Sequence, residues 1–343
     1  MLSYRHAFHA GNHADVLKHV TLVATLQYML QKDSALQVVD THAGAGLYRL
    51  DGDYSVKAGE AADGVLKWIE TLNFSEKMKD VTVEWSYNAT KNIAKELTGP
   101  VAPALQAYLD VLLAFNKKNG LKVYPGSPLI TQYLLRNEAR DKLKLFEMHP
   151  TDYRALIGHV EQLQAGRMVA ISDADGFASL KTLLPPPATG TAARRSLVIM
   201  DPSYEIKSDY ALVSAHIADC IKRFSTGTYM VWYPIIPRAE SHDLPRKLKS
   251  LAMTAKKSWL HATLNVGQED EPADKVSVTV KYDQNGLPLP AHRQKERPGL
   301  RESGMFLINP PHTLKAALQL ALPQVLAVLG RGRGKGFVVE GGG

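Results

Sequence analysis

Four residues that together could activate an amine, Asp201-Pro-Ser-Tyr204, follow directly after an apolar run at 196–200. A carboxylate and a carbonyl that accept the two hydrogens of an aromatic exocyclic amine draw its nitrogen toward sp³ geometry and free its lone pair. Asp201 can supply the carboxylate, Pro202 the carbonyl, and Tyr204 a ring on which a base stacks. With a methyl group on a sulfonium as the electrophile, positioning and electrostatics would supply most of the rate without a metal. The alternative is an acidic turn whose tyrosine is simply packed.

A glycine loop, Asp40-Thr-His-Ala-Gly-Ala-Gly46, stands at the end of an earlier apolar run. Glycine has no Cβ, so the backbone at Gly44 and Gly46 can approach a ligand closely and adopt positive φ. The third glycine of a dinucleotide-binding fingerprint is missing, which leaves an ordinary tight turn as the alternative. Two acidic strand ends in one chain nevertheless favour a site for a nucleotide-like ligand.

The elements that must position these residues alternate along the chain. Helical periodicity covers 13–31, with Asn12 as the expected N-cap, and the first strand begins at about Gln37. Further apolar runs of strand length cover 143–147, 166–171, 197–200, 228–234, 259–266 and 305–308, and helical segments cover 152–163, 177–184, 210–224 and 244–255. Alternating strands and helices predict a doubly wound, mostly parallel α/β sheet. Ligands of such sheets bind at the carboxyl ends of the strands, where both acidic turns fall.

The distance between the first two strand ends is unusually long. In a compact nucleotide-binding unit, the acidic residue that closes the second strand lies about 20 residues beyond the glycine loop. Here Glu147 closes the next clear strand of that kind, far beyond Gly46. Helical patterns at 61–72, 89–97 and 102–116 fill the interval. We therefore expect a helical subdomain inserted over 50–120, beside the mouth of the ligand site.

Composition narrows the class of protein. The chain has 343 residues, of which 45% are hydrophobic and 22% charged, as in globular proteins that bury a substantial core. Forty-one Lys and Arg residues against 34 Asp and Glu suit an anionic partner such as nucleic acid. Cys220 is the single cysteine, which excludes an internal disulfide and predicts a small buried side chain. Without a signal-peptide pattern or an apolar run near the roughly 18 residues that span a bilayer, we expect a cytoplasmic monomer without membrane contact.

Six segments carry a resemblance to a known family, and they occur in order over almost the whole chain. They are Tyr4-Arg-His-Ala-Phe-His-Ala-Gly-Asn-His-Ala-Asp-Val-Leu-Lys-His19, the glycine loop, Tyr124-Pro-Gly-Ser-Pro-Leu-Ile130, Glu147-Met-His-Pro-Thr-Asp-Tyr153, Ala174-Asp-Gly-Phe177 and Trp232-Tyr-Pro234. These segments closely resemble the bacterial 23S ribosomal RNA adenine-N6 methyltransferases of the RlmJ family. The resemblance implies a class I methyltransferase fold, Rossmann-like with a mostly parallel seven-stranded sheet and a small inserted helical subdomain. It also implies methylation of one adenine of 23S rRNA.

The resemblance further implies roles for individual residues. The methyl donor would be S-adenosyl-L-methionine, giving S-adenosyl-L-homocysteine as product without a metal. Its site would comprise Lys18, His19, Asp40, His42, Gly44, Gly46, Ser127, Glu147, Asp175 and Gly176, with Glu147 on the ribose hydroxyls and Asp175 on the donor's adenine amine. The substrate would contact Tyr4, Arg5 and His6. Asp201, Pro202 and Tyr204 would form the catalytic turn.

The same motifs divide the chain into four parts. Residues 1–49 would form the substrate and cofactor segment with the first strand, 50–120 the inserted subdomain, 121–328 the rest of the methyltransferase domain and 329–343 a flexible basic tail. The chain departs from the family's usual Asp-Pro-Pro-Tyr at Ser203. It also has a longer stretch at 268–303, for which a solvated hairpin and a contact with the RNA backbone are both open.

The sequence leaves four alternatives to the interpretations above. Asn309-Pro-Pro-His312 resembles the catalytic tetrad of other amino-methyltransferases, although it follows the last strand. Histidines at 6, 9, 13 and 19 could suggest a metal, but no carboxylate cluster accompanies them in the sequence, so we expect none. The turn at Asp201 does not select RNA. DNA adenine or a protein side-chain amide is an alternative substrate, and a non-catalytic RNA-binding relative is the fourth possibility.

Overall fold

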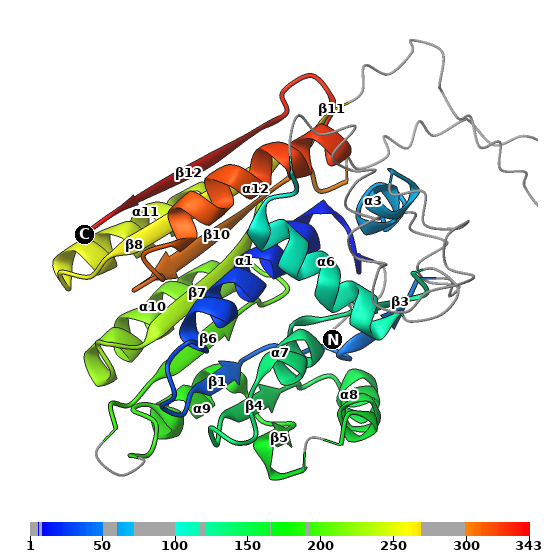
Figure 1. Ribbon diagram of the computed structural model, residues 1–343. Coiled ribbons are helices and arrows are strands. Elements are labelled where there is room, and N and C mark those ends of the chain that lie inside the picture. Colours follow the sequence, from blue (N-terminus) through cyan, green and yellow to red (C-terminus); the bar gives the residue numbers. More distant parts are fainter. Residues whose placement is uncertain are drawn as a thin grey trace, which may run out of the picture.

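A sheet of eight strands lies at the centre of the part of the protein that the structure describes (Figure 1). The computed structural model describes residues 6, 9–50, 60–71, 100–116, 121–164, 166–188, 192–268 and 299–343. Across the sheet the order is β12 (Gly336–Gly342), β8 (Trp259–Asn265), β10 (Glu302–Ile308), β7 (Thr228–Ile235), β6 (Ser196–Met200), β1 (Gln37–Asp40), β4 (Lys142–Phe146) and β5 (Val169–Ser172). Pairings from β7 to β5 are parallel, whereas β10 and β12 run antiparallel to their neighbours. The predicted doubly wound, mostly parallel sheet is therefore confirmed.

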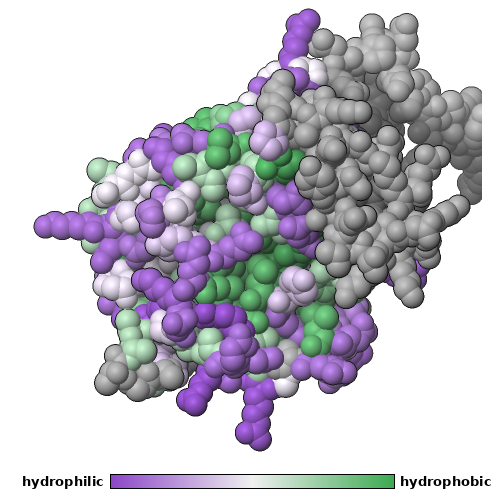
Figure 2. All heavy atoms as spheres, in the orientation of Figure 1, coloured by the Kyte–Doolittle hydropathy of each residue, from purple (hydrophilic) through white to green (hydrophobic). Residues whose placement is uncertain are grey.

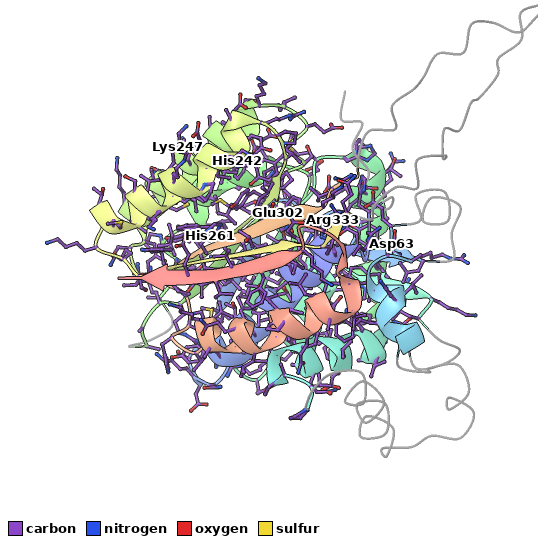
Figure 3. All side chains as sticks on the ribbon, turned by 90° about the horizontal axis from the view of Figure 1, so that it is seen from above. Asp63, His242, Lys247, His261, Glu302 and Arg333 are labelled. Atoms are coloured by element: carbon purple, nitrogen blue, oxygen red, sulfur yellow. The ribbon has the colours of Figure 1, made fainter. Side chains whose placement is uncertain are left out.

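Helices cover both faces of this sheet, so that the protein has three layers (Figure 1). One face carries α1 (His13–Met29), α6 (Pro103–Phe115), α7 (Ser127–Leu134), α8 (Pro150–Gln162) and α12 (Leu314–Leu329), and the other carries α9 (Gly176–Leu183), α10 (Ser208–Arg223) and α11 (Ala239–Thr254). Figure 2 shows hydrophobic residues between more hydrophilic neighbours on the side that faces the viewer in Figure 1. None of the helices in the described ranges is long and apolar enough to cross a membrane.

The central strands are buried on both faces, which explains their continuous apolar sequence. Successive side chains of a strand point to opposite faces. Val38 accordingly packs in the core beneath α1 and α12, and Val39 in the core beneath α10 and α11. Leu197 and Val198 of β6 divide between the same two cores. Cys220 of α10 is buried in the second core, as predicted.

Helix α1 positions charged residues inside the first layer. Its N-cap is Asn12, as predicted, because the Asn12 side chain accepts hydrogen bonds from the backbone N–H groups of Ala14 and Asp15. Almost every residue of the helix is buried, including Asp15 and Lys18. Burial of ionised groups is costly unless they are paired, so these two residues must have partners close to the helix.

The predicted insertion leaves and re-enters the domain at one place. Strand β2 (Leu47–Arg49), just after the glycine loop, pairs antiparallel with β3 (Val123–Pro125), just before α7. Between them the structure describes α3 (Val65–Thr71) and α6, both helical, whereas the predicted helix at 89–97 lies outside the described residues. The apolar face of α6 belongs to the core beneath α1. The division of the chain at 50 and 120 remains a prediction.

The C-terminal segment differs from the prediction of a flexible tail. Residues Arg331–Gly332 form β11, which pairs with β9 (Gly267–Gln268), and β12 pairs along the whole length of β8. A sheet edge supplies backbone donors and acceptors whatever the side chains are, so a glycine-rich sequence can add a strand there. This strand makes the sheet eight-stranded instead of seven-stranded. Most of the extra stretch at 268–303 lies outside the described residues.

Candidate functional site

A cavity of about 390 Å³ opens at the carboxyl ends of β1, β4 and β6. This is the edge at which open α/β sheets bind ligands, and the volume falls in the range of small-molecule sites. The lining residues come from α1, the glycine loop, the start of α7, the loop after β4, the start of α9 and the turn after β6. The lining includes His6, Lys18, Thr41, His42, Gly44, Ser127, Glu147, Met148, Asp152, Gly176, Asp201, Pro202, Ser203, Glu205, Ile206 and Asp209.

A chain of charged side chains connects the N-terminal segment to the turn after β6. The Lys18 ammonium donates to Asp201 Oδ2 at 2.7 Å and contacts Asp15 Oδ1 at 2.9 Å. The second oxygen of Asp15 lies 3.0 Å from His6 Nε2 and accepts from the backbone N–H of Gly11. The side chains of Asp15 and Lys18 are 2% and 6% exposed, and that of Asp201 is 15% exposed. The catalytic carboxylate predicted from sequence therefore has a buried cation as its partner.

The charged side chains of Asp15, Lys18 and Asp201 stabilise one another's ionised forms. Burial alone would lower the pKa of Lys18, but the carboxylates of Asp15 and Asp201 raise it well above its ordinary value. Burial would also raise the pKa of Asp15, yet His6 and Lys18 hold it well below its ordinary value. Lys18 is thus ammonium and Asp15 carboxylate across the physiological pH range. Asp15 supports the site through Lys18, and the sequence analysis did not identify it.

The glycine loop is joined to the end of β4 through Glu147. Gly44 has φ +63° and donates its backbone N–H to Glu147 Oε2 at 2.8 Å, while the N–H of His149 donates to Oε1 at 2.6 Å. Burial raises the pKa of Glu147, and the two backbone N–H groups oppose that rise. Each carboxylate oxygen has a second lone pair and Glu147 lines the cavity, so this residue can accept hydrogen bonds from two hydroxyl groups.

Asp40 supports the loop from beneath. It is fully buried and accepts from the Ser127 hydroxyl at 2.7 Å and from the backbone N–H of His42 at 3.3 Å. Burial raises the pKa of Asp40 to about 6, and the Ser127 hydrogen bond opposes the rise. Asp40 itself does not reach the cavity wall, but Ser127 does. Gly46, with φ +80°, also lies behind the wall, against Leu156 and Leu129.

The N-terminus of α9 approaches the loop after β1 very closely. A Cβ on Gly176 would lie 2.3 Å from the carbonyl oxygen of Thr41, so this position accepts only glycine without movement of the backbone. The Asp175 side chain caps α9 by accepting from the N–H groups of Phe177 and Ala178. The Phe177 ring lies between His42 and His216, with centroid separations of 4.6 and 4.7 Å. Burial lowers the pKa of His42 to about 4, so the ring is neutral at pH 7.

Other predicted residues lie away from the cavity wall. His19 is fully buried, and its Nδ1 lies 2.7 Å from the Tyr124 hydroxyl. Tyr204 is also buried, with its hydroxyl donating to the carbonyl of Trp232 at 2.7 Å and its ring against that of Tyr210. The structure therefore places the Tyr204 ring in the second core rather than on the cavity surface. Tyr4 and Arg5 lie outside the described residues.

The rival turn at Asn309 has a structural role. The Asn309 amide donates to the carbonyl oxygens of Ser225 and Gly227, and His312 lies 2.9 Å from the Tyr28 hydroxyl. Neither residue lines the cavity. Within the described ranges no group of His, Cys, Asp and Glu side chains is arranged to hold a metal ion.

Comparison with known proteins decides the family. A family model described as "Ribosomal RNA large subunit methyltransferase D, RlmJ" matches residues 33–92 and 89–280. The Ribosomal RNA large subunit methyltransferase J of Escherichia coli (strain K12) is 35% identical over 324 residues, covering 94% of this chain and 92% of that protein. The chain belongs to the RlmJ family. The protein of the same name from Haemophilus influenzae is 33% identical over 331 residues, covering 96% of this chain and 94% of its own.

The fold agrees with this assignment. A crystal structure of a Legionella pneumophila protein superposes with a TM-score of 0.70 at 28% identity, covering 97% of this chain and 98% of that one. The RlmJ-family chain is therefore a class I methyltransferase, and membership implies S-adenosylmethionine as its methyl donor. The cavity fits such a donor, because Glu147 can accept hydrogen bonds from ribose hydroxyls and the acidic wall formed by Glu147 and Asp152 suits a sulfonium cation.

Proposed function

We propose that the protein transfers a methyl group from S-adenosylmethionine to N6 of a single adenine in 23S rRNA, without a metal. The observation that carries this proposal is the position of Asp201, whose carboxylate closes a central strand beside the cavity and is fixed by Lys18 at 2.7 Å. The donor supplies an electrophilic methyl group. The chain has then only to hold the amine in line and to accept its hydrogens.

The residues of the turn can divide this work. Lys18 donates to Asp201 Oδ2, which leaves Oδ1 to accept one hydrogen of the adenine amine. The Pro202 carbonyl accepts the other, as the sequence predicts. As the nitrogen bonds to the methyl carbon and the carbon–sulfur bond breaks, the surplus proton on N6 leaves to solvent through Asp201. Ser203 replaces the family's second proline without removing either acceptor, so the chemistry needs no change in mechanism.

Two observations favour a nucleic acid as substrate, and the first of them favours RNA. The two relatives are named as large-subunit ribosomal RNA methyltransferases. The chain carries a net charge of +7, which suits a polyanion. The Asp201 side chain is only 15% exposed, so a base must leave its helix to reach it. We also propose that the enzyme acts as a cytoplasmic monomer, with Tyr4, Arg5 and His6 contacting the substrate.

The test is transfer of labelled methyl from S-adenosylmethionine to protein-free 23S rRNA, followed by digestion to nucleosides. We expect N6-methyladenosine from the wild type and a rate lower by roughly 10²–10⁴ for Asp201→Ala, with donor affinity nearly unchanged. Asp243→Ala, at an exposed position on α11, is the matched control. Equal rates for wild type and Asp201→Ala would refute the catalytic assignment.

The same assay separates the alternatives. If an adenine-containing DNA or a protein amide is methylated in preference to RNA, the proposed substrate is wrong but the catalytic role of the Asp201 turn stands. A protein that fails to bind S-adenosylmethionine by calorimetry would instead be a non-catalytic RNA-binding relative.

A further inference from the structure

A large apolar side chain, that of Ile206, is exposed at the mouth of the cavity. Ile206 is 60% exposed although most large apolar residues of the described chain are buried. Met253 and Leu320 have similar exposure at 61% and 60% but do not line the cavity, whereas Met148, 55% exposed, does. Ile206 differs from Met148 in following the turn that carries Asp201. A single exposed apolar side chain is ordinary by itself, but one that also lines the cavity is placed to contact whatever enters it. The question is which part of a substrate Ile206 contacts.

The exposure of Ile206 is imposed by the fold. Tyr204, two residues earlier, has φ +53° and is anchored through its hydroxyl to Trp232. The Ile206 carbonyl then accepts from the N–H of Asp209 at 3.2 Å, where α10 begins. The turn is thus held at one end by a buried tyrosine and at the other by a helix, with the Ile206 side chain exposed between them.

The position of the Asp201 carboxylate, deep in the cavity, determines how the amine of a substrate adenine can reach it. Asp201 is mostly buried and its Oδ2 is bonded to the buried Lys18, whereas Ile206 stands at the outer edge of the same cavity. An adenine stacked in an RNA helix cannot bring its amine to Asp201, so it must be extruded. Extrusion leaves an unfilled position in the base stack, which is unfavourable.

We propose that Ile206 enters the position in the RNA stack that the extruded adenine leaves. Proteins that distort duplexes insert apolar side chains of this kind between base steps. The charged residues near Ile206 agree with an RNA helix that lies outside the cavity. Glu205 and Asp209 line the cavity and repel phosphates from it, whereas Lys207, 72% exposed, is not among the lining residues and forms an ion pair with Glu240 at 3.3 Å. The substrate class is thus a helical RNA segment, and this inference rests on the proposed function.

The experiment compares two hairpin RNAs that differ only at the nucleotide opposite the target adenine. In one it is uridine, and in the other it is an abasic site, which leaves the adenine unpaired. For Ile206→Ala we expect kcat/KM on the paired RNA to fall roughly 10- to 100-fold, and the fall on the unpaired RNA to be about tenfold smaller. Ile206→Leu, which retains the apolar volume, should restore most activity on the paired RNA. Met253→Ala, equally exposed but outside the cavity, should change neither.

A binding measurement reports the extrusion without turnover. With 2-aminopurine at the target position and S-adenosylhomocysteine present, fluorescence should rise for the wild type and much less for Ile206→Ala. Equal losses on both RNAs would show that Ile206 contacts the base or donor within the cavity, and no loss on either would show no role; both results overturn the inference. A wild type that methylates neither RNA, as inactive as Asp201→Ala, would instead overturn the proposed function.

Discussion

Replacing Lys18 by methionine tests the charged chain at the centre of the site. Methionine has nearly the same length and apolar stem, so the change removes the ammonium while leaving little empty space. Lys18 contacts Asp15 at 2.9 Å and Asp201 at 2.7 Å, and all three side chains are at most 15% exposed. The variant leaves two carboxylates close together in a mostly buried position without their shared cation.

The expected losses in stability and in rate follow from the burial of these three side chains. Removing one partner of a buried ion pair typically costs about 3–5 kcal/mol, because the remaining charge has lost its compensation. We expect a loss of that size in the free energy of unfolding. The Asp201 carboxylate also loses the donor that orients it, and misplacement by about 1 Å can cost on the order of 10² in rate. The affinity for S-adenosylmethionine should change much less, because Glu147 and the glycine loop are unaffected.

The assay combines urea unfolding, donor calorimetry and single-turnover methyl transfer to 23S rRNA. Lys222→Met on the exposed face of α10 is the control for loss of a lysine and should behave as wild type. Lys18→Arg retains the charge in a different geometry and should recover stability more than rate. If Lys18→Met unfolds at the wild-type urea concentration and transfers methyl at the wild-type rate, the ion-pair chain contributes neither stability nor orientation, and our account of Asp201 is wrong.

Two further predictions concern the donor side of the cavity. Gly176→Ala would place a Cβ 2.3 Å from the Thr41 carbonyl oxygen. We therefore expect the free energy of unfolding to fall by about 1–3 kcal/mol and donor binding, measured by calorimetry, to weaken. Gly158→Ala on α8, where a Cβ meets nothing within 4 Å, is the control and should cause neither change. Burial lowers the pKa of His42 to about 4 from 6.5. The folded state therefore binds a proton at His42 less readily than the unfolded state does. The free energy of unfolding is unaffected by this difference above pH 6.5 and falls as the pH drops toward 4, by about 2 kcal/mol at pH 5. His42→Gln should show a smaller loss of unfolding free energy between pH 7 and 5, and an identical pH profile would contradict the burial argument.

The local features of this fold could be predicted from sequence because they depend on neighbouring residues. The continuous apolar runs of β1 and β6 follow from burial on both faces, and the cap at Asn12 depends on two N–H groups within three residues. Glu147 could be placed near the cavity because acidic turns after parallel strands converge at one edge, whereas Gly176 was assigned to the site only by the family resemblance. That edge is where the cavity lies.

Features that depend on distant residues could not be predicted. The contact of Lys18 with Asp201 joins residues that are 183 positions apart, and no spacing in the sequence indicates it. Asp15 precedes Lys18 by three residues, an ordinary helical ion-pair spacing, so the one signal that could have found it resembles any solvated pair. Tyr204 was expected on the cavity surface, but its position depends on the space between Tyr210 and Trp232. β12 forms because β8 offers a free edge.

The charges around the cavity explain how one site can hold both reactants. Carboxylates at Glu147, Asp152, Asp201, Glu205 and Asp209 line it, and Lys18 is the single lysine among the lining residues. A cavity with that excess of negative charge attracts a sulfonium cation and admits a neutral base, but it repels a phosphodiester. Under the proposed function, the RNA backbone therefore stays outside the cavity while the adenine alone enters. After transfer the donor has lost its positive sulfur, so the same field that favoured its binding holds the product less strongly and favours its release.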